Sequence, residues 1–139
     1  MSENQLGKLL GFRLVRMHVN EDQSVLYMCD NFENNIFKIE TDADCCSETW
    51  FADIIGVDYL LGHHITGVEL LSFSGEIEDG RTRQEVDIQY GFRLKTLLGD
   101  CDFIYRNSSN GYYGGDIEGV TLVDKIPDNM EIIKEDWTS

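Results

Sequence analysis

The 139-residue sequence contains little positive charge, with 11 lysine and arginine residues against 26 aspartate and glutamate residues. The resulting formal net charge of −15 at pH 7 repels phosphate groups, so we expect no direct binding to nucleic acid. An excess of carboxylates suits a basic protein partner or a divalent cation. It also keeps a protein soluble without any partner.

Long apolar runs are absent as well. None approaches the roughly 18 to 20 residues needed to cross a bilayer. Residues 1–5 lack the basic and then apolar pattern of a signal peptide. We therefore expect a cytoplasmic protein that does not associate with membranes. Its four cysteines, without a secretion signal, favour reduced thiols over a disulfide framework.

The chain has a single proline and no low-complexity segment that would mark a linker. Hydrophobic residues make up 42% of it, enough for a real core, and its length suits one domain. We predict a single domain over residues 1–127. An acidic C-terminal tail over residues 128–139 follows and either adds an edge strand or frays.

Alternating apolar and polar residues predict an antiparallel sheet with one buried face. The clearest run is in residues 85–97, where Val86, Ile88, Tyr90 and Phe92 alternate with polar residues and glycine. Further strands are predicted over residues 9–19, 24–29, 36–40, 65–73, 101–105 and 117–126. We expect an α+β fold with a mostly antiparallel sheet of about six or seven strands and one or two short helices.

The most unusual stretch is residues 44–51, Asp-Cys-Cys-Ser-Glu-Thr-Trp-Phe. Ser47 is a good N-cap, so a short helix is predicted from Glu48 onward. Trp50, Phe51 and Ile54 would then share one face of the helix and be buried against the sheet.

This Asp-Cys-Cys-Ser-x-x-Trp-Phe motif is followed at a distance by residues 110–115, Asn-Gly-Tyr-Tyr-Gly-Gly. The two motifs together resemble those of an uncharacterised family of small proteins found in phages and bacterial genomes. The resemblance covers most of the chain. It implies an accessory protein of phage type that acts in the cytoplasm of a bacterial host, and it assigns no role to individual residues.

The motif cysteines open two alternatives. Cys45 and Cys46 with His63 and His64 are ligand types that zinc prefers, but adjacent ligands fit a tetrahedral site poorly, so no metal or other cofactor is assigned. A pocket at these four residues and Ser47 that takes a small molecule or a metal ion is one alternative. The other is a cysteine-dependent enzyme, with Cys46 as nucleophile and His63 or His64 as its base.

The preferred interpretation is a protein without catalysis of its own that binds and modulates, most simply by inhibition, a host protein such as a defence or nucleic-acid enzyme. Lys38 is the only basic residue between Glu21 and Asp58, so this region offers carboxylates to a basic partner surface. Tyrosines on a glycine-rich loop offer large, rigid contact area. The predicted partner-binding residues are Glu33, Glu40, Asp42, Asp44, Tyr112 and Tyr113.

All four thiols, those of Cys29, Cys45, Cys46 and Cys101, are expected to be free in the native protein. A disulfide between the adjacent Cys45 and Cys46 would close a strained ring. Titration of the protein with a thiol reagent after unfolding without reductant should therefore detect all four, and a lower count would reveal a disulfide.

Overall fold

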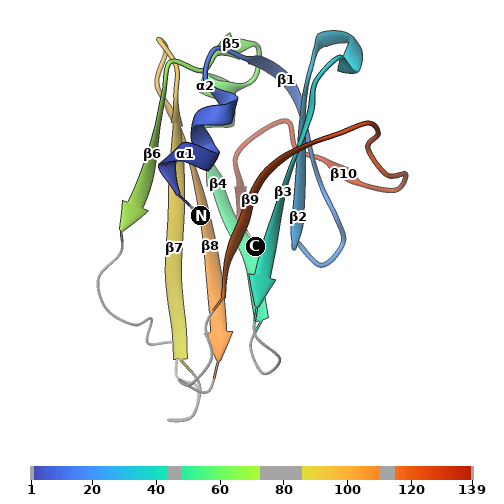
Figure 1. Ribbon diagram of the computed structural model, residues 1–139. Helices are drawn as coiled ribbons and strands as arrows, with labels where there is room; N and C mark the ends of the chain where they lie inside the picture. Colours follow the sequence, from blue (N-terminus) through green and yellow to red (C-terminus); the bar gives the residue numbers. More distant parts are fainter. Residues whose placement is uncertain (1, 44–47, 73–85, 110–114, 139) are drawn as a thin grey trace.

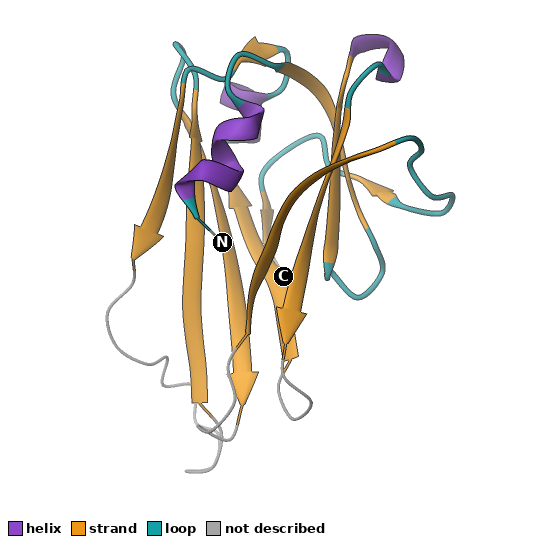
Figure 2. Cartoon of the chain, viewed as in Figure 1, coloured by secondary structure: helices purple, strands orange, loops and turns teal. Residues whose placement is uncertain are grey.

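The computed structural model describes residues 2–43, 48–72, 86–109 and 115–138 (Figure 1). Across these ranges, eleven strands form two antiparallel sheets that face each other across a shared core. Figure 2 shows how little of the chain is helical. No helix within these ranges is long and apolar enough to cross a bilayer.

The first sheet has six strands, and the second has five. In the first, the order is β10 (Glu131–Ile132), β1 (Arg13–Val19), β2 (Val25–Asp30), β3 (Ile36–Ala43) and β9 (Gly115–Val123), and β5 (His63–His64) pairs with β1. In the second, the order is β11 (Trp137–Thr138), β4 (Glu48–Ile55), β8 (Asp100–Ser109), β7 (Val86–Lys95) and β6 (Gly67–Ser72). The helices are single turns: α1 (Glu3–Leu6), η1 (Gly7–Leu9), η2 (Asn31–Glu33) and α2 (Val57–Leu60).

The expected α+β fold with one sheet is therefore wrong, because the protein is a two-layer β-sandwich. Each sheet turns one apolar face inward, and these faces cover each other, so no long helix is needed to bury them. Phe92 and Phe103 stack in this core with ring centroids 4.7 Å apart, and Phe12 meets Phe37 edge-on at 4.8 Å.

The predicted helix after Ser47 is also wrong, since residues 48–55 form strand β4, paired with β8. Capping signals are local and weak, whereas β-branched and aromatic residues favour a strand that finds a partner. Neighbouring strand residues face opposite sides of a sheet. Phe51 is therefore fully buried, while Trp50 lies on the outer face and is only half-buried.

A β-bulge changes the inward face of β1. Strict alternation predicts Leu14 on one face, with Met17 and Val19 on the other. The register shifts between Leu14 and Arg16, and this extra residue lets all three apolar side chains reach the core.

The N-terminal turns close one open edge of the sandwich, where α1 lies between the two sheets (Figure 1). Leu6 and Leu9 are fully buried there. Lys8 Nζ donates to Val120 O at 3.0 Å, and Val120 N donates to Gln5 Oε1 at 3.4 Å. These bonds satisfy the backbone of an edge strand that would otherwise be open to pairing with another chain.

The C-terminal segment is built into the sandwich. Between β9 and β10, which lie at opposite edges of the first sheet, Ile126 and Met130 pack against the outward side chains Tyr27, Cys29 and Ile36. Strand β10 is therefore an edge strand within residues 128–139, where the sequence predicts either an edge strand or a frayed tail. The domain boundary at residue 127 stays a prediction.

The opposite orientations of the neighbouring residues Phe51 and Trp50 can be tested by substitution. Phe51→Ala should lower the free energy of unfolding by about 3 to 5 kcal/mol, as for buried aromatics elsewhere. Trp50→Ala should cost only about 1 kcal/mol, because it removes a partly exposed ring. Urea denaturation of both variants measures the difference, and equal losses would contradict the placement of Trp50 on the outer face.

Candidate functional site

The strands that flank the two sequence motifs meet at one end of the sandwich. Ala43, the last residue of β3, pairs with Gly115, the first of β9. Glu48, the first residue of β4, pairs with Ser108 of β8, and Val86 pairs with Ser109. We call this end, defined by these paired strand ends, the motif end; it lies at the bottom of Figure 1. The predicted site residues Asp44, Cys45, Cys46, Ser47, Tyr112 and Tyr113 lie outside the described residues.

His63 and His64 lie at the other end of the molecule. They form β5, which pairs with Arg13 and Leu14 at the start of β1 (Figure 1). The eight residues of β3 separate this level from the motif end by roughly 25 Å. The described residues on either side of Cys45, Cys46 and Ser47 are therefore remote from both histidines. The predicted pocket that combines these three residues with His63 and His64 stays a prediction.

The predicted acidic residues that the structure describes, Glu33, Glu40 and Asp42, are spread from one end of the first sheet to the other. Glu33 belongs to η2, at the end opposite the motif end, and forms an ion pair with Arg16. Glu40 lies on β3, where its Oε2 is 3.1 Å from Lys38 Nζ, and this bond raises the pKa of Lys38. Asp42 pairs through its backbone with Asp116 close to the motif end.

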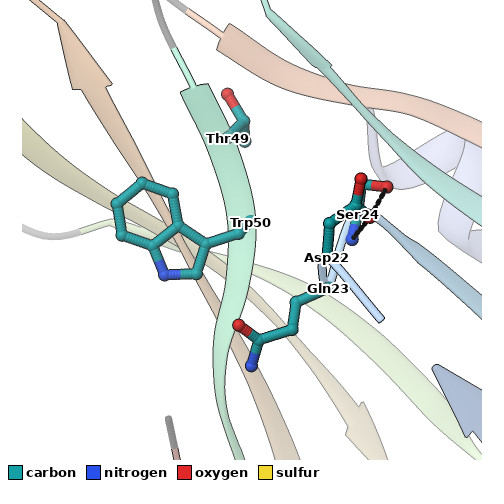
Figure 3. A pocket seen from close by; sticks show the side chains of 5 residues that line it. All are labelled: Asp22, Gln23, Ser24, Thr49 and Trp50. Atoms are coloured by element: carbon teal, nitrogen blue, oxygen red, sulfur yellow. Dashed lines mark hydrogen bonds between the residues drawn. The ribbon is translucent and has the colours of Figure 1, made fainter. Parts of the chain in front are cut away.

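Sequence reasoning missed a cleft of about 440 Å³ that lies beside β4 (Figure 3). Asp22, Gln23 and Ser24 of the turn between β1 and β2 line it together with Thr49 and Trp50 of β4. We call it the Trp50 cleft. It uses the tryptophan of the Asp-Cys-Cys-Ser-x-x-Trp-Phe motif, which the sequence pattern places in the core.

Side-chain hydrogen bonds shape the turn that forms one wall of this cleft. Asn20 Oδ1 accepts from the backbone nitrogens of Ser24 at 2.8 Å and Val25 at 2.9 Å. Asp22 Oδ1 accepts from Ser24 Oγ at 2.6 Å and from Asn20 Nδ2 at 2.7 Å. These contacts hold Gln23 in a left-handed conformation with φ of 64°.

Backbone hydrogen bonds then join the turn to the strands on both sides of it. Phe51 N donates to Gln23 O at 2.8 Å, which fixes the turn against the part of β4 that precedes its pairing with β11. Thr41 N donates to Ser24 O at 2.8 Å, and the Thr41 hydroxyl lies 3.1 Å from both Ser24 O and Thr49 O. The walls of the cleft are therefore fixed relative to each other before any ligand arrives.

The cleft combines a carboxylate with an aromatic ring. The hydrogen bond from the Ser24 hydroxyl is the largest of the effects that lower the pKa of Asp22, so Asp22 is ionised at neutral pH. Its Oδ2 accepts no hydrogen bond from the described residues. The guanidinium carbon of Arg106, on the neighbouring strand β8, lies 5.7 Å from the ring centroid of Trp50. In Figure 3 the Gln23 side chain extends toward the indole, while the Asp22 carboxylate turns back to Ser24.

The two cysteines that the structure describes are core residues. Cys29 and Cys101 are free thiols that are fully buried, and this burial is the main cause that raises the pKa of each. A raised pKa disfavours the thiolate that nucleophilic catalysis needs. Among the described side chains, no group of three or more His, Cys, Asp or Glu residues could hold a metal ion.

Comparison with known proteins places this two-sheet protein in a family. The chain belongs to the family with the domain of unknown function DUF7448, which matches residues 7–118 and so includes both motifs and the Trp50 cleft. It is 29% identical over 110 residues to the uncharacterized protein L278 of Acanthamoeba polyphaga mimivirus, covering 76% of this chain and 85% of the viral protein. No solved structure matches the chain. Membership of an uncharacterised family is thus confirmed, while an origin in phages or bacteria stays a prediction.

The hydrogen bond from Ser24 to Asp22 gives a prediction for pH dependence. The folded-state pKa of Asp22 lies below the unfolded value near 3.8. The ionised carboxylate therefore stabilises the folded protein fully above the unfolded pKa. This stabilisation is lost as the pH falls through the folded pKa. Ser24→Ala should raise the Asp22 pKa, whereas Ser24→Thr, which keeps the hydroxyl, should leave it low. Carboxyl carbon shifts followed by NMR report the midpoint, and an unchanged midpoint in Ser24→Ala would contradict this cause.

Proposed function

We propose that this protein is a non-catalytic accessory protein of viral type that binds a host protein in the cytoplasm and modulates it. The observation that carries the proposal is the register of the strands at the motif end. The described residues that flank the Cys-Cys motif lie beside those that flank the tyrosine motif, although about sixty residues separate the motifs in sequence. Loops held by rigid sheets at one end of a β-sandwich are common binding surfaces.

Charge supports a basic partner surface. Asp22 beside the motif end is ionised, Glu21 next to it is exposed, and the motif segment itself brings Asp42, Asp44 and Glu48. A protein with a net charge of −15 also attracts a basic partner at long range, which raises the rate of association. A strongly acidic protein can occupy a basic groove that otherwise binds nucleic acid, so a defence or nucleic-acid enzyme with such a groove is the partner we propose.

The kinetics of binding provide the test. Affinity capture from a lysate of candidate host cells, followed by mass spectrometry, supplies the partner, and surface plasmon resonance measures the rates. Association should slow steeply as salt rises, because exposed charges are screened beyond roughly 8 Å at physiological ionic strength. Glu40→Lys combined with Asp42→Lys should mainly slow association. Tyr112→Ala and Tyr113→Ala should mainly speed dissociation, because an aromatic anchor acts at short range.

Glu33→Lys is the matched control, because it reverses the same charge at the opposite end of the sandwich. It should slow association less than Glu40→Lys does. Binding that ignores salt, with both tyrosine variants behaving like the wild type, would reject docking through the motif end. It would favour the alternative of a small-molecule pocket at Cys45, Cys46 and Ser47.

A further inference from the structure

We propose that the Trp50 cleft receives an arginine side chain of the basic partner, with the guanidinium stacked on the indole of Trp50, hydrogen-bonded to the Gln23 amide and attracted by the ionised Asp22 of the same turn. The inference rests on the proposed function, since it names the group on the partner that this cleft recognises. It also gives a specific role to Asp22 and Gln23 of the turn between β1 and β2, which are not among the partner-binding residues predicted from the sequence.

A guanidinium needs three things from a binding site, and the cleft contains each of them. Its flat face stacks on an aromatic ring, its charge needs a carboxylate, and its N–H groups need further acceptors. Trp50 supplies the ring, and Asp22 supplies a carboxylate whose Oδ2 accepts no other hydrogen bond from the described residues. Gln23 supplies an amide oxygen from a side chain that extends toward the indole (Figure 3).

The indole already holds one guanidinium within the protein, that of Arg106 at 5.7 Å from the ring centroid. Arg106 is not among the described residues that line the cleft, and we propose that the incoming guanidinium stacks on the part of the ring that borders the cleft. Repulsion between the two cations weakens this binding. The ionised Asp22 and the neighbouring Glu21 offset that repulsion.

Charge and rigidity favour arginine over other ligands. A neutral sugar could also stack on Trp50, but it would not use the charge that Ser24 and Asn20 maintain on Asp22. Lysine has a charge but no plane to stack. Since hydrogen bonds to Phe51 and Thr41 fix the turn in advance, binding orders little of the protein and loses little entropy.

The test uses the full-length protein labelled with ¹⁵N and the peptide glycyl-arginyl-glycine amide. NMR follows the indole N–H signals of Trp50 and Trp137, the only two tryptophans. The Trp50 signal should shift to saturation, while that of Trp137, which lies on β11, should not. The same peptide with citrulline, which has the shape of arginine without its charge, should bind about tenfold more weakly or not at all.

Two variants separate the cleft from general charge. Asp22→Asn should weaken binding of the arginine peptide by about tenfold, because it removes the negative charge from the wall of the cleft. Glu21→Gln removes the same charge from the adjacent exposed residue and should have a much smaller effect. An unmoved Trp137 signal shows that each variant is folded.

Three results would overturn the inference: equal binding of the citrulline peptide, equal effects of Asp22→Asn and Glu21→Gln, or no shift of Trp50 with arginine. A shift of Trp50 with a neutral oligosaccharide but not with the arginine peptide would assign the cleft to sugars instead. The two proposals fail separately. If the captured partner depends on Tyr112 and Tyr113 while arginine leaves Trp50 unmoved, only the inference about the cleft is wrong. If the peptide binds while docking ignores salt and both tyrosines, the proposed function is wrong.

Discussion

Burial of two sheet faces against each other is the constraint on which the rest of the structure depends. Strand β4 must send Phe51 into the core, and because neighbouring residues in a strand point to opposite sides, Trp50 must then face outward. The core and the candidate site are thus fixed by the same alternation. A helix over these residues would have put both rings on one side and left no aromatic wall for the cleft.

The turn between β1 and β2 is the second point on which the site depends. It belongs to the first sheet, yet its Gln23 carbonyl accepts a hydrogen bond from β4 of the second sheet. The two layers are therefore joined beside the motif end by backbone contact as well as by side-chain packing. Since the same short turn contains Asp22, the link between the sheets also sets where the carboxylate stands relative to Trp50.

Alternation of apolar and polar residues was enough to predict most of the strands, because half-buried strands leave a period-two pattern, as in Tyr90 and Phe92. It could not predict the bulge in β1 beyond Leu14, where one extra residue resets the period. Alternation also did not correct the helix that the capping signal of Ser47 predicts. Residues 48–55 form a strand because they pair with β8, and this pairing cannot be seen in the local sequence. The cleft could not be predicted from the sequence for a similar reason. Asp22 and Trp50 are far apart in sequence, and only the register of the sheets brings them to the same cleft.

The structure also changes how the net charge of −15 should be interpreted. Several acids are neutralised where they stand: Glu33 by Arg16, Glu40 by Lys38, and Asp102 by Arg93 at 2.7 Å. Each of these ion pairs has no net charge, so the charge of −15 resides on the other carboxylates, and reversing one acid of a pair leaves two neighbouring positive charges. A carboxylate such as Asp22, whose hydrogen bonds come from neutral donors, keeps its full charge. Recognition of a basic partner therefore depends less on how many acids the chain has than on which of them face solvent without a cation beside them.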